Sequence, residues 1–267
     1  MINLSPQIRK SRNVLETSAA AWYSVVLLGQ WIFVAYIFYA YGWPMIAGQL
    51  SEWNAHLSEA YIPGRHMGNG FVAAHLALAV IIHFLGPLQL VPAVRKRFPT
   101  FHRWVGRSFV FGVIVAIASG TYMLIARDIG EWPLFVGFGL QIVLVTWFAW
   151  LTVKYARAKK FSIHMRWATR LFLAASAVWF LRVIIMAWFV FTGGIGIDTS
   201  DGTGWFLNIM AIAQFTPVLI YEIYIRIKEG TNAKAHYAMT AFMGFATIFT
   251  VIGVTFAALG MWFSVLG

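Results

Sequence analysis

The chain contains no cysteine and few acidic residues, and both shortages narrow what it can be. Without cysteine there can be no disulfide, no iron–sulfur cluster and no thiolate nucleophile, and the redox compartment stays undetermined. Charged residues make up only 11% of the 267 residues, against about 25% in a typical soluble domain. A water-soluble fold of this size would need polar surface that the chain lacks. We therefore expect an integral membrane protein, in which lipid surrounds the apolar surface.

Long apolar runs are abundant where charge is scarce. A membrane-spanning helix needs about 20 mostly apolar residues. The sequence predicts seven spans, forming an all-α integral membrane bundle with one domain over residues 1–267. The spans are expected at 21–41, 69–91, 102–126, 133–154, 164–192, 205–227 and 238–263. The first run follows Arg9, Lys10 and Arg12 but is too long for the apolar core of a signal peptide, so we interpret it as an uncleaved span.

The basic residues lie almost entirely on one side of the predicted bundle. Of the 20 Lys and Arg residues, 17 fall in the N-terminal tail and in the connections between spans 2 and 3, 4 and 5, and 6 and 7. The opposite connections hold only Arg65 and Arg127. Because cytoplasmic segments are enriched in Lys and Arg, we expect a cytoplasmic N-terminus and an external C-terminus, in a cytoplasmic (inner) membrane. Anionic lipid headgroups, rather than nucleic acid, then explain the net charge of +11.

A basic, aromatic signature that contains a histidine occurs twice at predicted cytoplasmic ends of spans. It reads FPTFHRWVGRSF at 98–109 and FSIHMRWATRLF at 161–172. One interpretation is interfacial anchoring, because tryptophan prefers the headgroup level and arginine reaches lipid phosphates. The anchoring residues would be Arg103, Trp104, Arg107, Arg166, Trp167 and Arg170.

A second interpretation gives the histidines of these connections a metal ion or a haem edge. His102 and His164 belong to the repeated signature, and His236 lies in a third connection, TNAKAHYAMTAF at 231–242. Each begins an odd-numbered span at a similar depth. Imidazole binds iron, copper and zinc, and Glu222 near the end of span 6 would add a carboxylate. The sequence does not place spans 3, 5 and 7 side by side, so both interpretations stay open.

The segment of about 75–185 carries motifs that resemble a known family. The pattern is a histidine in a span, Gly-Pro-x-Gln, Arg-x-x-x-Pro-x-x-His-Arg-x-x-Gly-Arg, His-x-Arg-Trp-x-x-Arg and a Leu-Arg deep in a span. The matching residues are His75, Gly86, Pro87, Gln89, Arg95, Pro99, His102, Arg103, Gly106, Arg107, His164, Arg166, Arg170 and Arg182. On these residues the chain resembles a bacterial family of predicted multi-pass membrane proteins classed as a domain of unknown function. The resemblance implies topology and motif positions, and it brings no established activity.

Arg182 is expected near the middle of the membrane. It lies 12 residues beyond Arg170, which is about 18 Å deeper along a straight helix. A charge at that depth costs at least about 2.5–3.5 kcal/mol on insertion scales. Its neighbours by depth are His75, Gln141 and Gln214. Arg182 either bonds carbonyls and these amides as structural glue, or it meets an anionic or carbonyl ligand such as a haem propionate, a quinone or a lipid phosphate.

Three classes of function follow from these residues. The first is a redox-linked binder of haem b or a quinone that uses His75, His83 and Arg182. A b-type haem would need histidines on two facing helices, whereas His75 and His83 share span 2. A haem would therefore have to pair His83 with a histidine at the cytoplasmic interface, or His75 with a histidine of the 42–68 connection. The second is an accessory or assembly subunit that binds other membrane subunits, and the third is a lipid-handling protein. Nothing in the sequence resembles a phosphate-binding loop, a nucleophile triad or paired catalytic carboxylates, so enzymatic activity is left open.

The charge asymmetry predicts the topology directly. Reporter domains fused after Lys160 should lie in the cytoplasm, and reporter domains fused after Gly267 should lie outside, because 17 basic residues mark one side. The measurement is reporter activity in whole cells. A cytoplasmic reporter after Gly267 would mean that 205–227 or 238–263 does not cross the membrane.

Overall fold

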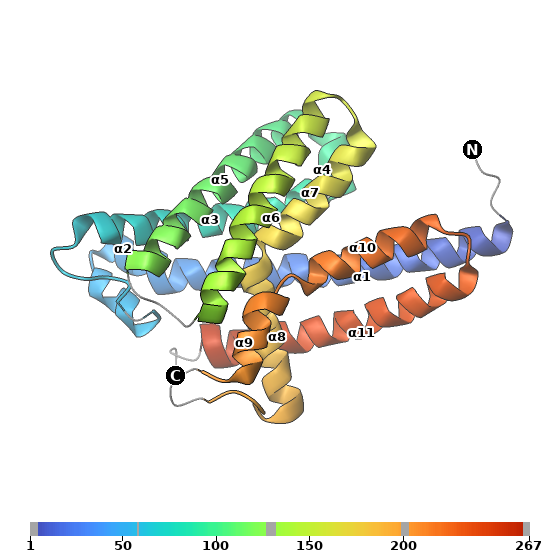
Figure 1. The fold of residues 1–267 in the computed structure, drawn as a ribbon. Helices are drawn as coiled ribbons and strands as arrows, with labels where there is room; N and C mark the ends of the chain where they lie inside the picture. The colour runs from blue at the N-terminus through green and yellow to red at the C-terminus, as the bar shows by residue number, and fades with distance from the viewer. Residues whose placement is uncertain (1–4, 58, 127–131, 199–202, 264–267) are drawn as a thin grey trace.

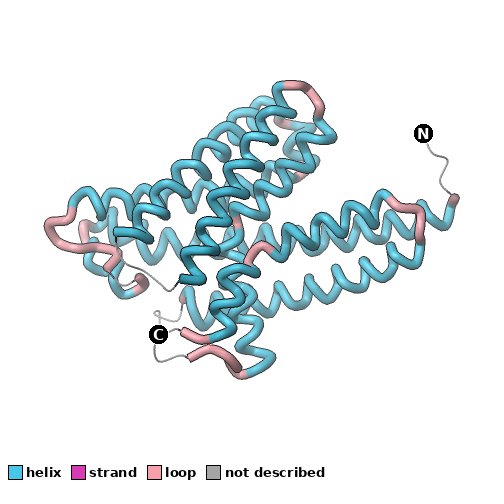
Figure 2. Tube along the Cα trace, in the orientation of Figure 1, coloured by secondary structure: helices cyan, strands magenta, loops and turns pink. Residues whose placement is uncertain are grey.

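The computed structural model describes residues 5–57, 59–126, 132–198 and 203–263, and these are almost entirely helical. The helices are α1 (Pro6–Ile37), α2 (Trp43–Ala47), α3 (His66–Leu90), α4 (Pro92–Arg97), α5 (Pro99–Ala126), α6 (Trp132–Arg157), α7 (Phe161–Ala175), α8 (Ala177–Thr192), α9 (Trp205–Ala213), α10 (Thr216–Glu229) and α11 (Ala233–Ala257). Two π-helical turns, Phe38–Gly42 and Ala258–Trp262, extend α1 and α11, and a 3₁₀ helix covers Leu50–Ala55. Figures 1 and 2 show this all-α architecture.

Five described helical segments are long and apolar enough to cross a membrane, and the number rises to seven if two bent pairs each count as one span. The bent pairs are α7 with α8 and α9 with α10. The all-α membrane fold predicted from the apolar runs is therefore confirmed, with the predicted runs falling on these segments. The orientation of the termini stays a prediction, and Gly267 lies outside the described residues.

The fifth and sixth predicted spans are each bent, although the sequence analysis treated each of them as one continuous helix. α9 and α10 meet at 48° where Pro217 follows the break. Proline lacks an N–H and its ring clashes with the carbonyl four residues earlier, here that of Ala213, which favours a break or a kink at this point. α7 and α8 meet at 57° at Ser176, where no proline is present. There the buried amide of Gln30 on α1 donates to the Ser176 hydroxyl at 3.0 Å, which supports the break from outside.

The bend at Ser176 corrects the expected depth of Arg182. Six residues of α7 run from Arg170 to the bend, and six residues of α8 then run at 57° to them. The distance from Arg170 to Arg182 along the α7 axis is therefore about 14 Å rather than the 18 Å of a straight helix.

The helices form two groups that diverge toward one end of the molecule. α3, α5, α6 and α7 pack in a ring, in which each helix contacts the next. α1 packs along α11, and α11 also packs against α8 and α10. In Figure 1 the first group rises upward, whereas α1, α10 and α11 extend to the right. Ion pairs from Arg166 to Glu229 and from Arg170 to Glu222 join α7 of the first group to α10 of the second.

The second group packs closely because two glycines leave room for neighbouring helices. A Cβ at Gly29 of α1 would meet the Trp179 ring and the Val254 side chain, and a Cβ at Gly253 of α11 would meet the backbone carbonyl of Val183 on α8. Small residues at such contacts allow membrane helices to approach closely and to gain van der Waals contact. This contact holds α8 against α11.

The long connection between α1 and α3 is folded onto the bundle. The indole of Trp53 is buried and donates to the carbonyl of Tyr41 at 2.9 Å. Asn54 exchanges two hydrogen bonds with the backbone of Tyr61. The connection thus forms an ordered cover over the end of α1.

Gly253→Ala should destabilise the protein, because the added Cβ meets a backbone carbonyl that cannot move without shifting α8. Overpacking of this kind costs about 1–3 kcal/mol. Gly244→Ala on the same helix meets nothing within 4 Å and gains helix propensity, so it should leave stability unchanged or raise it. Thermal unfolding in detergent compares the two variants, and equal stabilities would show that α8 and α11 are not packed in this way.

Candidate functional site

Arg182 projects from α8 into a cluster of aromatic side chains. Its guanidinium lies 5.7 Å from the centre of the Phe33 ring of α1. Its one described hydrogen bond is a long one, 3.4 Å to the carbonyl of Val178 on its own helix. It is close enough to Tyr36 and Tyr41 to interact with them electrostatically. A guanidinium has five N–H donors, so most of the donor capacity of Arg182 is not used by these residues.

Phe33 is the centre of the aromatic cluster. The imidazole of His83 on α3 meets the Phe33 ring edge-on at 5.3 Å, and the indole of Trp262 lies 5.1 Å from it. Tyr36 stacks on both Phe33 and Trp262. Residues from α1, α3, α8 and the C-terminal π-helical turn thus meet around the Phe33 ring, which the guanidinium of Arg182 also contacts. We call Arg182, Phe33, Tyr36, His83 and Trp262 the Arg182 cluster.

Two members of the cluster have buried polar atoms without a partner among the described residues. They are Nδ1 of His83 and Nε1 of Trp262. His83 is 8% exposed and Trp262 is 1% exposed, so bulk solvent does not meet these atoms. The indole N–H of Trp262 and the guanidinium of Arg182 can donate hydrogen bonds but cannot accept them. The cluster therefore has an excess of donors, and its complement is a molecule with oxygen acceptors.

The ordered connection closes one side of the cluster. The His56 ring lies 5.8 Å from the Tyr36 ring and 5.7 Å from the Tyr41 ring. Burial lowers the pKa of His56 below its ordinary value of 6.5, because the charged imidazolium loses hydration there. The neutral form of His56 is thus the one that fits the closed connection.

The polar pocket predicted around Arg182 is assembled only in part. His75 and His83 are both near enough to Arg182 to interact with it electrostatically. His75 turns toward α5, where Nδ1 lies 3.1 Å from both the Ala116 carbonyl and the Ser119 hydroxyl. The side chain of His83, rather than that of His75, therefore enters the aromatic cluster.

The two amides expected in this pocket bond elsewhere, Gln141 to a carbonyl of α7 and Gln214 to a carbonyl of its own helix, α9. Gln141 donates to the carbonyl of Ala174 at 3.3 Å, and Gln214 donates to the carbonyl of Ala211 at 2.6 Å. A Cβ at Gly137 of α6 would meet both Ala211 and the Gln214 amide, which places Gln214 between α6 and α9. Neither amide has a hydrogen bond to Arg182 within the described ranges. Depth along a span was not enough to identify neighbours, because the helix faces also matter.

Two of the three histidines considered for a metal are held by separate contacts, whereas Nδ1 of His102 is buried without a partner among the described residues and His102 is near enough to His164 to interact with it electrostatically. Both ring nitrogens of His236 have partners, with Nδ1 2.8 Å from the Ser11 hydroxyl and Nε2 2.9 Å from the Ile227 carbonyl. Nδ1 of His164 lies 3.0 Å from the Thr152 carbonyl. In the part of the chain that the structure describes, no group of three or more His, Asp or Glu side chains is placed to hold a metal. The expected convergence of His102, His164 and His236 is therefore not found.

The two copies of the repeated signature differ in their surroundings. In the first copy Trp104 is 63% exposed and Arg107 lies 5.2 Å from its ring, as a headgroup anchor requires, and Arg103 is also exposed. In the second copy Arg170 stacks on Trp167 at 4.3 Å and forms two bonds to Glu222, at 2.5 and 2.9 Å. Glu222 thus pairs with an arginine and not with the histidines. The second copy ties α7 to α10.

Sequence reasoning missed the aromatic members of the cluster. Phe33 lies near the middle of the first predicted span and Tyr36 toward its end, beside Tyr41, and Trp262 lies at the end of the last span. Aromatic residues at span ends are typical of the membrane interface, so the sequence offered no reason to turn them inward. His56 gave no signal either, because its position depends on how the long connection folds.

These features define an all-α integral membrane protein with a donor-rich aromatic cluster inside its bundle. Residues 72–200 match the model of a family described as "Predicted membrane protein (DUF2306)", which confirms the resemblance over the segment that carries the motifs. The family is of unknown function. No curated protein and no solved structure matches the chain.

His56 makes the closure of the connection pH-dependent. Because its folded-state pKa is lowered, its contribution to stability is present above the unfolded value of 6.5 and is lost as the pH falls toward the folded-state pKa. Thermal stability should therefore decrease more steeply below pH 6.5 in the wild type than in His56→Gln. His66→Gln, at an exposed histidine, is the control and should keep the wild-type profile. Identical profiles for the wild type and His56→Gln would contradict the burial of this ring.

Proposed function

We propose that the Arg182 cluster binds a lipid-soluble molecule with a planar carbonyl head, of the quinone class. The observation that carries the proposal is the excess of donors, at the partly buried guanidinium of Arg182 and at the buried Nε1 of Trp262, within walls of aromatic rings. Quinone carbonyl oxygens accept hydrogen bonds, and a planar ring stacks on aromatic faces. A redox-linked role is consistent with such a ligand.

The cost of a guanidinium inside the membrane supports a ligand over a purely structural role. Structural glue would satisfy the donors of Arg182 with carbonyls at normal hydrogen-bond distances of about 2.7–3.2 Å. The described bond to Val178 is longer, at 3.4 Å. The cation–π contact with Phe33 offsets part of the cost, but it leaves the N–H donors free to meet a carbonyl oxygen.

The positions of the histidines support a carbonyl ligand better than a haem b. Two axial histidines would have to face each other from different helices. His75 and His83 share α3, and their rings turn to different neighbours: a carbonyl and a hydroxyl of α5 for His75, and the Phe33 ring for His83. A visible spectrum of the purified protein tests this point, because a bound haem would give a Soret band.

A short-chain benzoquinone should raise the thermal stability of the detergent-purified protein. A ligand at about 100 times its Kd stabilises the folded state by about 2.7 kcal/mol. Arg182→Leu removes the guanidinium, and Arg182→Lys keeps a charge without the planar fork, so both should reduce the shift. Trp262→Phe keeps an aromatic ring and removes its N–H, and it should reduce the shift less.

The control for charge is Arg97→Leu, at an exposed arginine of α4. The control for the ligand is the dimethyl ether of the corresponding hydroquinone, which has the same ring and tail but no carbonyl. The proposal is wrong if the ether stabilises the protein as much as the quinone does. It is equally wrong if the quinone shift is as large in Arg182→Leu and Trp262→Phe as in Arg97→Leu.

A further inference from the structure

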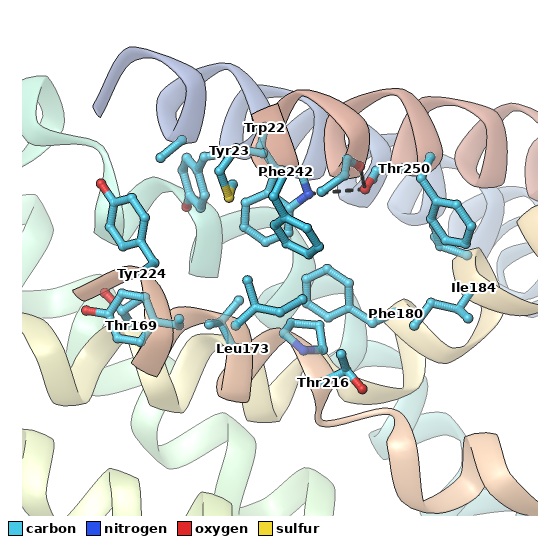
Figure 3. A pocket seen from close by; sticks show the side chains of 18 of the residues that line it. Trp22, Tyr23, Thr169, Leu173, Phe180, Ile184, Thr216, Tyr224, Phe242 and Thr250 are labelled. Carbon is cyan, nitrogen blue, oxygen red and sulfur yellow. Dashed lines mark hydrogen bonds between the residues drawn. The ribbon is translucent and has the colours of Figure 1, made fainter. Parts of the chain in front are cut away.

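An apolar cavity lies between the two helix groups. Its volume is about 430 Å³, and α1, α7, α8, α10 and α11 supply nearly all of its lining. Figure 3 shows side chains of these helices turned toward one another around the space. Pockets of about 300–1,000 Å³ hold ligands of drug size, and a cavity with apolar walls does not hold water well. The cavity is therefore suited to an apolar ligand.

The cavity has a buried floor and an exposed mouth. Phe172 of α7 and Phe180 of α8 are 2% and 4% exposed, whereas Phe242 and Phe245 of α11 are 40% and 61% exposed. Phe242 and Phe245 lie 9 and 12 residues into α11, which is about 14 and 18 Å from its start. In a helix that crosses a membrane, that depth is within the hydrocarbon core, which is about 30 Å thick. The mouth therefore opens sideways toward lipid chains.

Two of the hydroxyl-bearing side chains lie at one end of the cavity, whereas the hydroxyls of Thr216 and Thr250 elsewhere in the lining donate to the carbonyls of Ala213 and Ala246. Tyr224 and Thr169 lie together at one end of the view in Figure 3, and Ile184 lies at the other. Tyr221 also lines the cavity, and behind it Arg170 stacks on its ring at 5.8 Å while bonding Glu222. The hydroxyl end is thus next to the basic hairpins, and the other end lies deeper among apolar side chains. This arrangement suits a molecule with a polar head and an apolar chain.

The cavity is separate from the Arg182 cluster. Phe180, Val183 and Ile184 of α8 line the cavity. At 100° per residue, Arg182 points about 100–160° away from these three side chains around the helix. α8 therefore has the cavity on one face and the Arg182 cluster on the other.

We infer that this cavity binds one hydrocarbon chain of a membrane lipid, which enters sideways past Phe242 and Phe245. The head of the lipid lies at Thr169, Tyr221 and Tyr224. The chain replaces bilayer contacts with the walls of the cavity, and the hydroxyls supply hydrogen bonds at its polar end.

Photolabelling with palmitate that carries a diazirine in mid-chain tests the inference. The whole protein, purified in detergent, is irradiated with the probe, and the adducts are mapped by mass spectrometry. Adducts are expected on the lining of α7, α10 and α11. Ala246→Trp fills the cavity from α11 and should reduce this labelling at least several-fold, whereas Ala241→Trp, at an exposed position of the same helix, should not.

A second matched pair guards against a folding defect in one variant. Ala19 of α1 lines the cavity, whereas its neighbour Ala20 is exposed. Ala19→Trp should reduce labelling, and Ala20→Trp should leave it unchanged. Equal labelling within both pairs would overturn the inference, as would adducts that lie away from the lining. An excess of the short-chain benzoquinone should not compete, and competition would show that the two sites are not separate.

Discussion

A guanidinium inside a lipid bilayer must have its hydrogen bonds and its charge met by the protein or by a bound molecule. Arg182 lies on α8, which together with α7 forms a bent pair that is apolar enough to cross the membrane if the pair counts as one span. Around it the chain turns aromatic rings inward that would otherwise serve at the interface, and it closes the connection between α1 and α3 over them. Insertion of arginine at the centre of a membrane helix costs at least about 2.5–3.5 kcal/mol of free energy. Contacts of the guanidinium with the protein or with a bound molecule must offset this cost.

The bend at Ser176 connects this cluster to the rest of the bundle. α7 belongs to the ring of four helices, and α8 packs on α11 in the other group. The bond from Gln30 to Ser176 and the close contact of Gly253 with Val183 fix the direction of α8. With that direction fixed, Arg182 faces the cluster while Phe180 and Val183 face the cavity. One short helix thus separates a donor-rich site from an apolar one, and the ion pairs between α7 and α10 hold the two groups together beside the cavity.

Much of the fold could be predicted from the sequence, because a run of about 20 apolar residues is a strong local signal. The break before Pro217 was not predicted, because a proline does not always interrupt a helix, and α3 continues through Pro87. The break at Ser176 was not predicted either, because Gln30, which bonds to Ser176, is 146 residues away in the sequence. The candidate site was only partly predicted for the same reason, because contacts between residues far apart in the sequence cannot be identified from local patterns. Arg182 could be identified from depth and charge alone, whereas Phe33, Trp262 and His56 could be identified only from packing. The histidines of the basic hairpins share a depth, but His236 turns toward Ser11 and His164 toward Thr152.

The most direct test of the Arg182 site is the position at which a ligand is bound. An arylazido benzoquinone, photolysed with the purified protein and followed by peptide mapping, reports that position. Our account predicts adducts on the segments that hold Tyr36 and Trp262, and the loss of these adducts in Arg182→Leu. Adducts confined to the lining of the apolar cavity, or adducts on Tyr36 and Trp262 that persist unchanged in Arg182→Leu, would contradict it.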